Sequence, residues 1–228
     1  MHALASRAAV IVIVDVLSFS TAVDVAVSRG AEVYPFAFDH PEAARQAALR
    51  VGAVLAGHRD TPGNGYSLSP ASLQTIPAGT RLLLPSPNGS RLAFAASRAT
   101  RKTAVLAGCL RNARAVVRMA RALAGADAIA VIPAGETWPD GSLRPAIEDL
   151  LGAGAIIHHL EGTPEPEAQI ARDAYRNAGA DIDHLVRLSV SGRELTDRGF
   201  SGDVDLALEE NVSGTAPLLT ADAFAARA

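Results

Sequence analysis

The stretch VIVIVDVLSFSTAVDVAVSRG, residues 10–30, predicts a strand followed by a helix. Its first residues are apolar on both faces, which is typical of a central parallel strand covered by helices on each side. Ser18 or Ser20 can cap the helix, in which apolar residues recur at helical spacing. Asp15 interrupts the apolar run where burying an unpaired carboxylate is most costly. We therefore expect Asp15 to face a binding partner at the end of this strand.

The same alternation continues along the chain. Strand-like runs are expected at 9–16, 32–37, 53–57, 81–85, 103–107 and 128–132, and helix-like runs at 20–29, 41–51, 89–98, 112–124 and 144–160. Strands that alternate with helices favour parallel pairing in a layered domain. The sequence therefore predicts a three-layer α/β/α fold with a largely parallel or mixed central sheet.

Three segments depart from this pattern. Residues 160–228 are helical but less periodic, so we expect a helical C-terminal appendage or lid within a single domain, 1–228, with a strand candidate at 216–219 and a frayed tail at 221–228. Asp39 is a candidate cap for the helix at 41–51. The loop at 58–70 is rich in Gly, Pro and Ser, and loops of this length are usually functional or mobile.

Composition excludes several classes of protein. The chain has 228 residues, 49% of them hydrophobic, a formal net charge of −3 and only 4% aromatic residues, so no basic, aromatic surface for nucleic acid is expected. A single cysteine excludes an internal disulfide framework and suits a reducing cytoplasm. No apolar run approaches the ~18 residues that predict a membrane span, and the run before Asp15 is short for a signal peptide. A homodimer is the default expectation.

Small polar residues follow the strands. They are Asp15, Ser18, Ser20 and Thr21 after the first strand, Asn88, Gly89, Ser90 and Arg91 after the fourth, Cys109, Arg111 and Asn112 after the fifth, and Glu136, Glu148 and Asp149 after the sixth. In open parallel sheets, ligands bind at the carboxyl ends of the strands. Carboxylates beside free helix N-termini suit a hard divalent cation together with a phosphate.

Simpler interpretations of these residues remain open. Asp15 can bind backbone amides of its own turn, and Glu148 and Asp149 can stabilise the first turn of a helix. Cys109 is more typical of a small buried residue than of an activated thiolate. No zinc-ligand spacing, Walker A loop or complete dinucleotide fingerprint is present.

Several blocks, taken in order, resemble the ComB-like 2-phosphosulfolactate phosphatase family. These are VIVDVLSFST at 12–21, LAGHR with GYSLSP within 55–70, SPNGSR at 86–91, LAGCLRNA at 106–113, IPAGE followed by EDLLGAGAII within 132–157, and SGRELTDRGFSGDVDLAL with APLL within 191–219. The resemblance implies an α/β/α fold and a magnesium-dependent phosphatase acting on phosphate esters of 2-hydroxy acids. The family's named substrate lies on a route to coenzyme M.

This resemblance, with the residues above, predicts a cytoplasmic Mg²⁺-dependent phosphatase for a small anionic phosphorylated acid. Asp15, Glu148 and Asp149 are the expected catalytic and metal-binding residues; direct attack by water and a phospho-aspartyl intermediate both remain open. The expected substrate-binding residues are Ser18, Ser20, Thr21, Asn88, Gly89, Ser90, Arg91, Arg111 and Asn112.

One departure from the family bears on substrate choice. Ser18 stands where many members carry an arginine, and Arg111 is the candidate to replace that charge. Two other functions remain as alternatives. One is a non-catalytic protein that binds a phosphorylated metabolite, and the other is a magnesium-dependent lyase or isomerase that stabilises an enolate.

Overall fold

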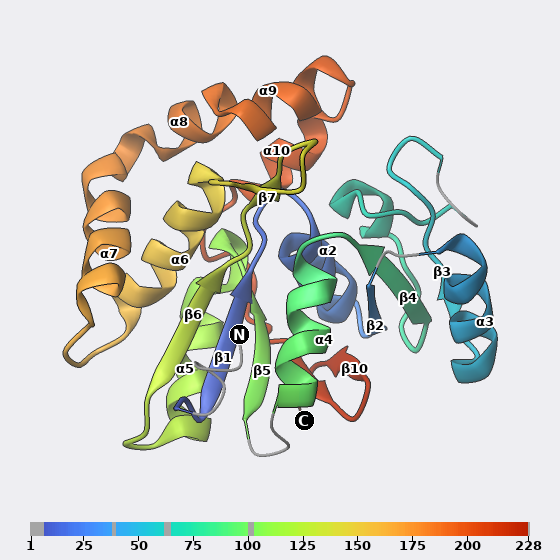
Figure 1. Ribbon diagram of the computed structural model, residues 1–228, viewed down its shortest axis with the longest axis horizontal. Helices are drawn as coiled ribbons and strands as arrows, with labels where there is room; N and C mark the ends of the chain where they lie inside the picture. Colours follow the sequence, from blue (N-terminus) through green and yellow to red (C-terminus); the bar gives the residue numbers. More distant parts are fainter. Residues whose placement is uncertain (1–6, 38–39, 62–64, 100–102, 228) are drawn as a thin grey trace.

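The first strand, β1 (Val10–Val14), lies inside the central sheet. It pairs in parallel with β5 (Ala104–Gly108) on one side and with β6 (Ile129–Pro133) on the other. The computed structural model describes residues 7–37, 40–61, 65–99 and 103–227. Figure 1 shows these three strands side by side, with β1 and β6 ending toward the top of the view. The sequence prediction of a buried parallel strand at this position is confirmed.

Two parallel groups of strands make up the sheet. Within the described residues its order is β3-β4-β2-β10-β9-β5-β1-β6. The second parallel group contains β2 (Glu32–Ala37), β3 (Val54–Leu55) and β4 (Arg81–Ser86). An antiparallel hairpin of β9 (Leu218–Thr220) and β10 (Ala223–Ala225) joins the groups by pairing with β5 and β2. The sheet is therefore mixed.

Alternate residues of β1 enter two different apolar cores, because successive side chains of a strand point to opposite faces. Val10, Val12 and Val14 pack with residues of α5 (Ala113–Ala124) and α6 (Ile147–His159). Ile11 and Ile13 belong to the core that includes α2 (Phe19–Ser28) and α4 (Gly89–Ala99). The sheet lies between helical layers, which confirms the three-layer α/β fold.

The expected helix at 41–51 is present as α3 (Pro41–Val51). Asp39, its expected cap, lies outside the described residues, and His40 occupies the N-cap position without a side-chain capping bond. The predicted strand at 216–219 matches β9, but the prediction of a frayed tail is wrong. Phe224 in β10 is fully buried and meets the ring of Phe19 edge to face, with centroids 5.9 Å apart. This aromatic contact fixes the tail in the middle of the sheet.

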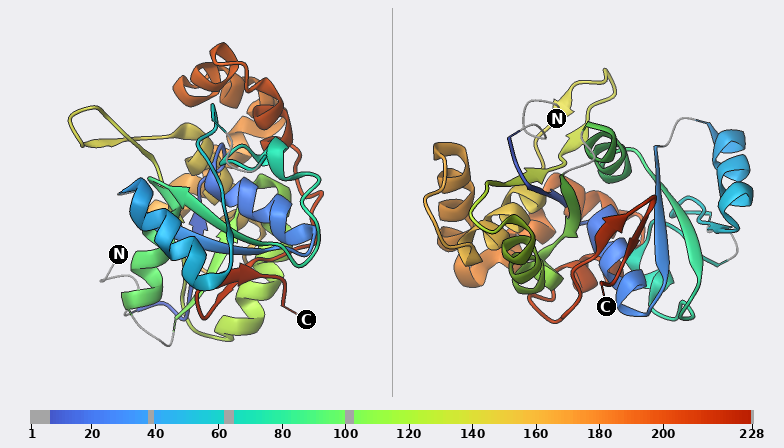
Figure 2. Two further views of the ribbon diagram at one scale, coloured as in Figure 1. Left: turned by 90° about the vertical axis from the view of Figure 1, so that its right-hand side faces the viewer. Right: turned by 90° about the horizontal axis from the view of Figure 1, so that it is seen from below.

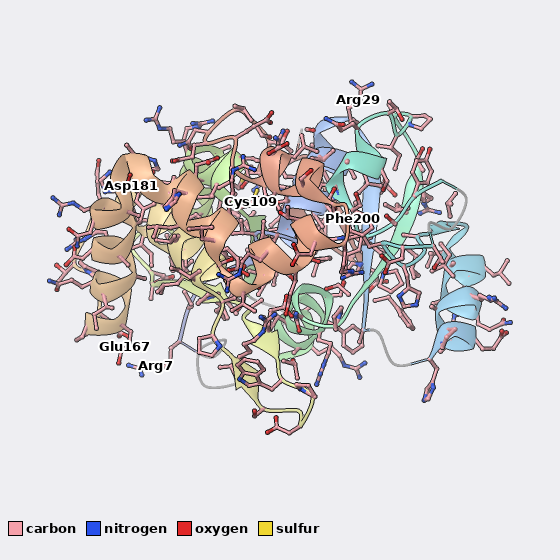
Figure 3. All side chains as sticks on the ribbon, turned by 90° about the horizontal axis from the view of Figure 1, so that it is seen from above. Arg7, Arg29, Cys109, Glu167, Asp181 and Phe200 are labelled. Carbon is pink, nitrogen blue, oxygen red and sulfur yellow. The ribbon has the colours of Figure 1, made fainter. Side chains whose placement is uncertain are left out.

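Four helices precede that hairpin: α7 (Pro166–Ala178), α8 (Ile182–Leu188), α9 (Val190–Asp197) and α10 (Ser201–Ala207). In Figure 1 they run upward along the left side of the protein and then across the edge at which β1 and β6 end, which Figure 3 shows from above. Val186, Leu195 and Val204 are buried in the same core as β1. The C-terminal region is therefore packed into the main core. Short 3₁₀ turns lie at Pro70–Leu73, Leu110–Asn112 and Gly179–Asp181.

A small hairpin projects from the same edge. It consists of β7 (Glu136–Thr137) and β8 (Leu143–Arg144), and Figure 2 shows its loop extending away from the body. Trp138 and Leu143 on this hairpin are exposed. Among the described residues, no helix combines the length and the apolar character needed to cross a membrane.

Candidate active site

Asp15 follows β1 directly, and the turn that carries it is held by short-range hydrogen bonds. The Asp15 backbone N–H donates to Ser20 Oγ at 3.1 Å, and Ser20 Oγ donates to the carbonyl of Ile13 at 2.9 Å. The Asp15 side chain is almost entirely buried. A buried carboxylate needs hydrogen-bond or charge partners, so the residues around Asp15 determine what it can do.

The first partner of Asp15 is the N-terminus of α4. Asp15 Oδ2 accepts a hydrogen bond from the backbone N–H of Gly89 at 3.0 Å. A Cβ atom at position 89 would lie 2.7 Å from Asp15 Oδ2 and 2.4 Å from Phe19 Cδ1. Only glycine permits this approach. The sequence predicted that Gly89 takes part in the site, and the structure places its backbone against Asp15.

Asp149 connects the ends of two strands to the first turn of α6. Its Oδ1 accepts from the Val16 N–H at 2.7 Å, and its Oδ2 accepts from the Gly135 N–H at 2.9 Å. Val16 follows β1 and Gly135 follows β6. Because both oxygens bind backbone amides, Asp149 fixes the position of Asp15, one residue before Val16.

Glu136 and Asn88 form a second polar contact at this edge. Asn88 Nδ2 donates to Glu136 Oε2 at 2.9 Å, which joins the residue before α4 to the start of β7. Glu148, also predicted for the site, is buried in the first turn of α6. Glu136 was noted at a strand end but was left out of the predicted catalytic set. The structure brings it close enough for its charge to act on Asp15.

Burial and the charge of a neighbouring carboxylate raise the pKa values of Asp15 and Asp149. Desolvation is the main cause for Asp15, and the charge of Glu136 adds to it, so that the pKa of Asp15 is about 7. The amide of Gly89 opposes this shift. Burial, followed by the charge of Asp15, raises the pKa of Asp149 well above its usual value. The site thus concentrates negative charge that a cation would stabilise.

Two arginines, one half-buried and one buried, lie at the same edge, and neither was predicted. Arg59 donates from Nη2 to the carbonyl of Leu17 at 2.9 Å, and its charge acts on Asp15. Arg144 in β8 is buried and pairs with Glu194 of α9 at 3.1 Å. The sequence feature that could have indicated Arg59 is its position in the long loop at 58–70, because such loops are often functional. Nothing in the sequence near 144 indicated a buried cation.

Most of the hydroxyl groups that were predicted to bind substrate instead donate hydrogen bonds to backbone carbonyls. Ser20 Oγ binds Ile13, Thr21 Oγ1 donates to the carbonyl of Val16 at 2.5 Å, and Ser90 Oγ donates to the carbonyl of Leu84 at 2.9 Å. Ser18, at the N-cap of α2, is partly exposed and makes no side-chain capping bond. Ser18 is therefore the predicted hydroxyl that is best placed to respond to a ligand.

The other predicted substrate-binding residues, Arg111, Asn112 and Arg91, make no contact with Asp15 among those that the described residues show. Arg111 Nε pairs with Asp24 at 3.0 Å, and its Nη1 contacts Glu209. Asn112 Oδ1 accepts from the Cys109 N–H at 2.9 Å and closes the turn after β5. Arg91 is exposed on α4. The guanidinium of Arg111 thus already has two acidic partners within the protein.

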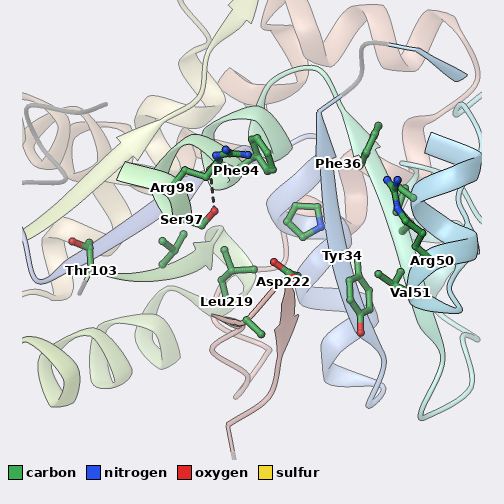
Figure 4. Close-up of a pocket in the computed structure, with 15 residues that line it drawn as sticks. Tyr34, Phe36, Arg50, Val51, Phe94, Ser97, Arg98, Thr103, Leu219 and Asp222 are labelled. Carbon is green, nitrogen blue, oxygen red and sulfur yellow. Dashed lines mark hydrogen bonds between the residues drawn. The ribbon is translucent and has the colours of Figure 1, made fainter. Parts of the chain in front are cut away.

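One cavity of the protein lies away from this site. A cavity of about 740 Å³ lies between α3 and α4, and its wall includes Tyr34, Arg50, Phe94 and Arg98 (Figure 4). None of the site carboxylates lines it. The chemistry-bearing residues instead converge where β1, β4 and β6 end. Within the ranges that the structure describes, no three His, Cys, Asp or Glu side chains are gathered closely enough to hold a metal ion.

Comparison with known proteins agrees with the motifs. A family model described as 2-phosphosulpholactate phosphatase matches residues 2–222. A protein of Methanothermobacter thermautotrophicus named 2-phosphosulfolactate phosphatase is 32% identical over 209 residues, covering 91% of this chain and 85% of that protein. One of Pseudothermotoga lettingae, named probable 2-phosphosulfolactate phosphatase, is 26% identical over 223 residues, covering 96% and 93% respectively.

A third relative, from Carboxydothermus hydrogenoformans and also named probable 2-phosphosulfolactate phosphatase, is 27% identical over 215 residues. It covers 91% of this chain and 84% of that protein. The resemblance that the sequence blocks indicated is therefore confirmed over nearly the whole length of the molecule. The chain belongs to the 2-phosphosulfolactate phosphatase family, a family of phosphoric monoester hydrolases.

Proposed function

We propose that this protein is a Mg²⁺-dependent phosphatase that hydrolyses phosphate monoesters of small 2-hydroxy acids, of the 2-phosphosulfolactate type. The observation that carries the proposal is the contact between Asp15 and the Gly89 N–H. It places a buried carboxylate against the N-terminus of an 11-residue helix, where backbone N–H groups attract anions. A carboxylate and an anion-binding helix end are thus side by side.

The residues around Asp15 are compatible with Mg²⁺. Their potential ligands are the oxygen atoms of carboxylates, and the single cysteine, Cys109, is buried with Asn112 and not with Asp15. Mg²⁺ prefers oxygen ligands and is usually held by one or two carboxylates, with waters and substrate phosphate completing its shell. A group of three protein carboxylates is therefore not required. Asp15 would hold the ion, and Glu136 is the second candidate.

When bound, Mg²⁺ supplies positive charge that offsets repulsion between the site carboxylates and a phosphate dianion. The protein's own residues hold the two candidate ligands, Asp15 and Glu136, in place. Asp149 fixes the backbone after Asp15, and Asn88 fixes Glu136. The first-turn amides of α4 beyond Gly89, whose own N–H already donates to Asp15, would bind the phosphate. Asp15 can either bind the ion or attack phosphorus. Both roles require its side chain to be an ionised carboxylate.

A phosphate-release assay tests the proposal. Purified protein is incubated with 2-phospholactate, phosphoglycerate or 2-phosphosulfolactate, with Mg²⁺ and, separately, with EDTA. We expect Mg²⁺-dependent release that EDTA abolishes and added Mg²⁺ restores. Equal release with and without EDTA would overturn the metal assignment. Absence of release from all three esters would overturn the phosphatase assignment and favour the binding-protein or lyase alternatives. A cytoplasmic location and a homodimer remain predictions from the sequence.

A further inference from the structure

Arg59 is a largely shielded cation beside the turn that carries Asp15. Its side chain is only 9% exposed. Nη2 donates to the carbonyl of Leu17 at 2.9 Å and reaches the carbonyl of Leu68 at 3.4 Å. Leu17 lies two residues after Asp15, so the guanidinium is at the same turn as the proposed reacting carboxylate. Its charge acts on both Asp15 and Glu136.

The guanidinium is fixed from the opposite side by α10 and the loop before it. Arg59 Nε lies 3.3 Å from Asp203 Oδ2, and Asp203 Oδ1 accepts from Ser69 Oγ at 2.5 Å and from the Ala71 N–H at 3.2 Å. The ring of Phe200 lies 5.7 Å from the guanidinium carbon. Asp203 therefore acts as a positioning residue, and the Arg59 side chain has little freedom to leave the site.

Part of the hydrogen-bonding capacity of Arg59 is unused by the described residues. A guanidinium carries five N–H donors. The contacts given above engage Nη2 and Nε, whereas Nη1 makes no hydrogen bond with the described part of the chain. The neighbouring buried arginine, Arg144, is already paired with Glu194. Arg59 is therefore the better placed of the two to accept an additional anionic partner.

Resting on the proposed function, we propose that Arg59 binds the carboxylate of the 2-phospho acid and so sets the substrate class. In such a substrate, the carboxylate and the phosphate oxygen are attached to the same carbon. The protein has matching groups close together, because Arg59 contacts the residue-17 carbonyl while Asp15 contacts the N-terminus of α4. A guanidinium suits a carboxylate because it donates charge-assisted hydrogen bonds in a planar arrangement.

The location of Arg59 also explains how the site can have a positive charge although position 18 is a serine. Arg59 comes from a different segment, yet it reaches the carbonyl that immediately precedes Ser18. It thus brings a positive charge to the turn that lacks its own arginine. Arg111, the replacement predicted from the sequence, is instead held by Asp24 and Glu209.

The test compares two esters that differ only in the acid group. 2-Phospholactate carries the carboxylate, and isopropyl phosphate has a methyl group in its place. For Arg59→Gln, we expect kcat/KM for 2-phospholactate to fall about 10- to 150-fold relative to isopropyl phosphate, the range for one charge-assisted hydrogen bond. Arg59→Lys should recover part of the loss. Arg198→Gln is the matched control, because Arg198 faces the same Phe200 ring but is exposed and pairs with Asp60.

Thermal unfolding of each variant separates a specific effect from a structural one. Equal losses with both esters, accompanied by a lower melting temperature, would overturn the assignment. 2-Phosphosulfolactate is the third ester: if Arg59→Gln removes only the advantage of its sulfonate, Arg59 is not the carboxylate ligand. If the wild-type protein releases no phosphate, the proposed function fails, but calorimetric binding of the same esters still tests Arg59. A carboxylate preference that disappears in Arg59→Gln supports the inference, and its absence from the wild-type protein overturns it.

Discussion

Asp15 Oδ2 and the backbone N–H of Gly89 are 3.0 Å apart, although 74 positions separate the two residues in the chain. The contact joins the end of β1 to the beginning of α4. It also gives a buried carboxylate the favourable field of a helix N-terminus, which only partly compensates for the loss of water. This close approach depends on glycine, because a Cβ atom at position 89 would overlap Asp15 Oδ2 and Phe19.

The first prediction concerns Gly89→Ala. The new Cβ would overlap Asp15 Oδ2 and Phe19, so the end of α4 must shift. We expect a loss of about 1–3 kcal/mol in unfolding free energy, typical of overpacking, together with lower kcat. Denaturant unfolding and phosphate release measure the two effects. Gly214→Ala is the control, since nothing lies within 4 Å of a Cβ there. Two variants of equal stability and activity would show that α4 tolerates the shift.

The second prediction concerns Asp15→Asn. This change keeps the size of the side chain and an oxygen that can accept from Gly89, but it removes the charge. We expect kcat to fall at least ~100-fold, the order lost with one strong transition-state contact. Circular dichroism should show an intact fold. Asp140→Asn, at an exposed position in the hairpin loop, should leave kcat unchanged. Near-normal turnover in Asp15→Asn would assign Asp15 to a structural role.

The third prediction is a pH dependence of stability in EDTA. The pKa of Asp15 is about 7 in the folded protein and 3.8 in its ordinary state, so the folded form binds more protons between these values. Unfolding free energy therefore falls as pH rises through this range. Between pH 6 and pH 8 we expect a loss on the order of 1 kcal/mol. Thermal melting should show this slope in the wild-type protein and a weaker slope in Asp15→Asn; equal slopes would contradict the assigned pKa.

Some residues that the sequence placed at strand ends are in contact in the structure, as Asp15 and Gly89 are, while their roles in the site stay predictions. Asp15 and Gly89 were expected there because parallel strands deliver their carboxyl ends to ligand sites. Position along a strand does not fix the direction of a long side chain, so Arg111 was predicted for the site but binds Asp24. Asp149 was predicted as a metal ligand, whereas its oxygens hold two backbone amides. An aspartate at this edge of the sheet can either bind a ligand or hold backbone amides, and the sequence does not distinguish the two.

Contacts between distant segments escaped prediction. Arg59 depends on Asp203, which is 144 positions later in the chain, and no local pattern connects them. The three-residue strand β10 is too short for a period-2 pattern to be recognised. It is a strand because its backbone pairs with β2 and β9, and Phe224 is buried against Phe19. Short elements that are held by tertiary packing therefore require the folded structure.

The fourth prediction concerns the single cysteine. Burial, with the charge of Asp24 in addition, raises the pKa of the Cys109 thiol to about 12, so it stays protonated near neutral pH. Only a thiolate is an effective nucleophile. We expect no reaction with a thiol reagent at pH 8 in the folded protein and complete reaction after unfolding in guanidinium. Cys109→Ala should retain phosphate release. Rapid labelling of the folded protein would instead indicate an activated thiolate.

The last prediction concerns the sulfonate of 2-phosphosulfolactate. This substrate carries a third anionic group, and Ser18, at the position where the family resemblance implies an arginine, is partly exposed without a capping bond. We expect the wild-type protein to hydrolyse 2-phospholactate at least as well as the sulfonated ester. Ser18→Arg should raise kcat/KM for the sulfonated ester about 10- to 150-fold relative to 2-phospholactate, because it adds one charge-assisted contact. Ser18→Gln, which adds length without charge, is the control. Competition kinetics between the two esters give the ratio directly. A wild-type preference of more than about tenfold for the sulfonated ester, equivalent to about 1.4 kcal/mol, would mean that another cation already binds the sulfonate.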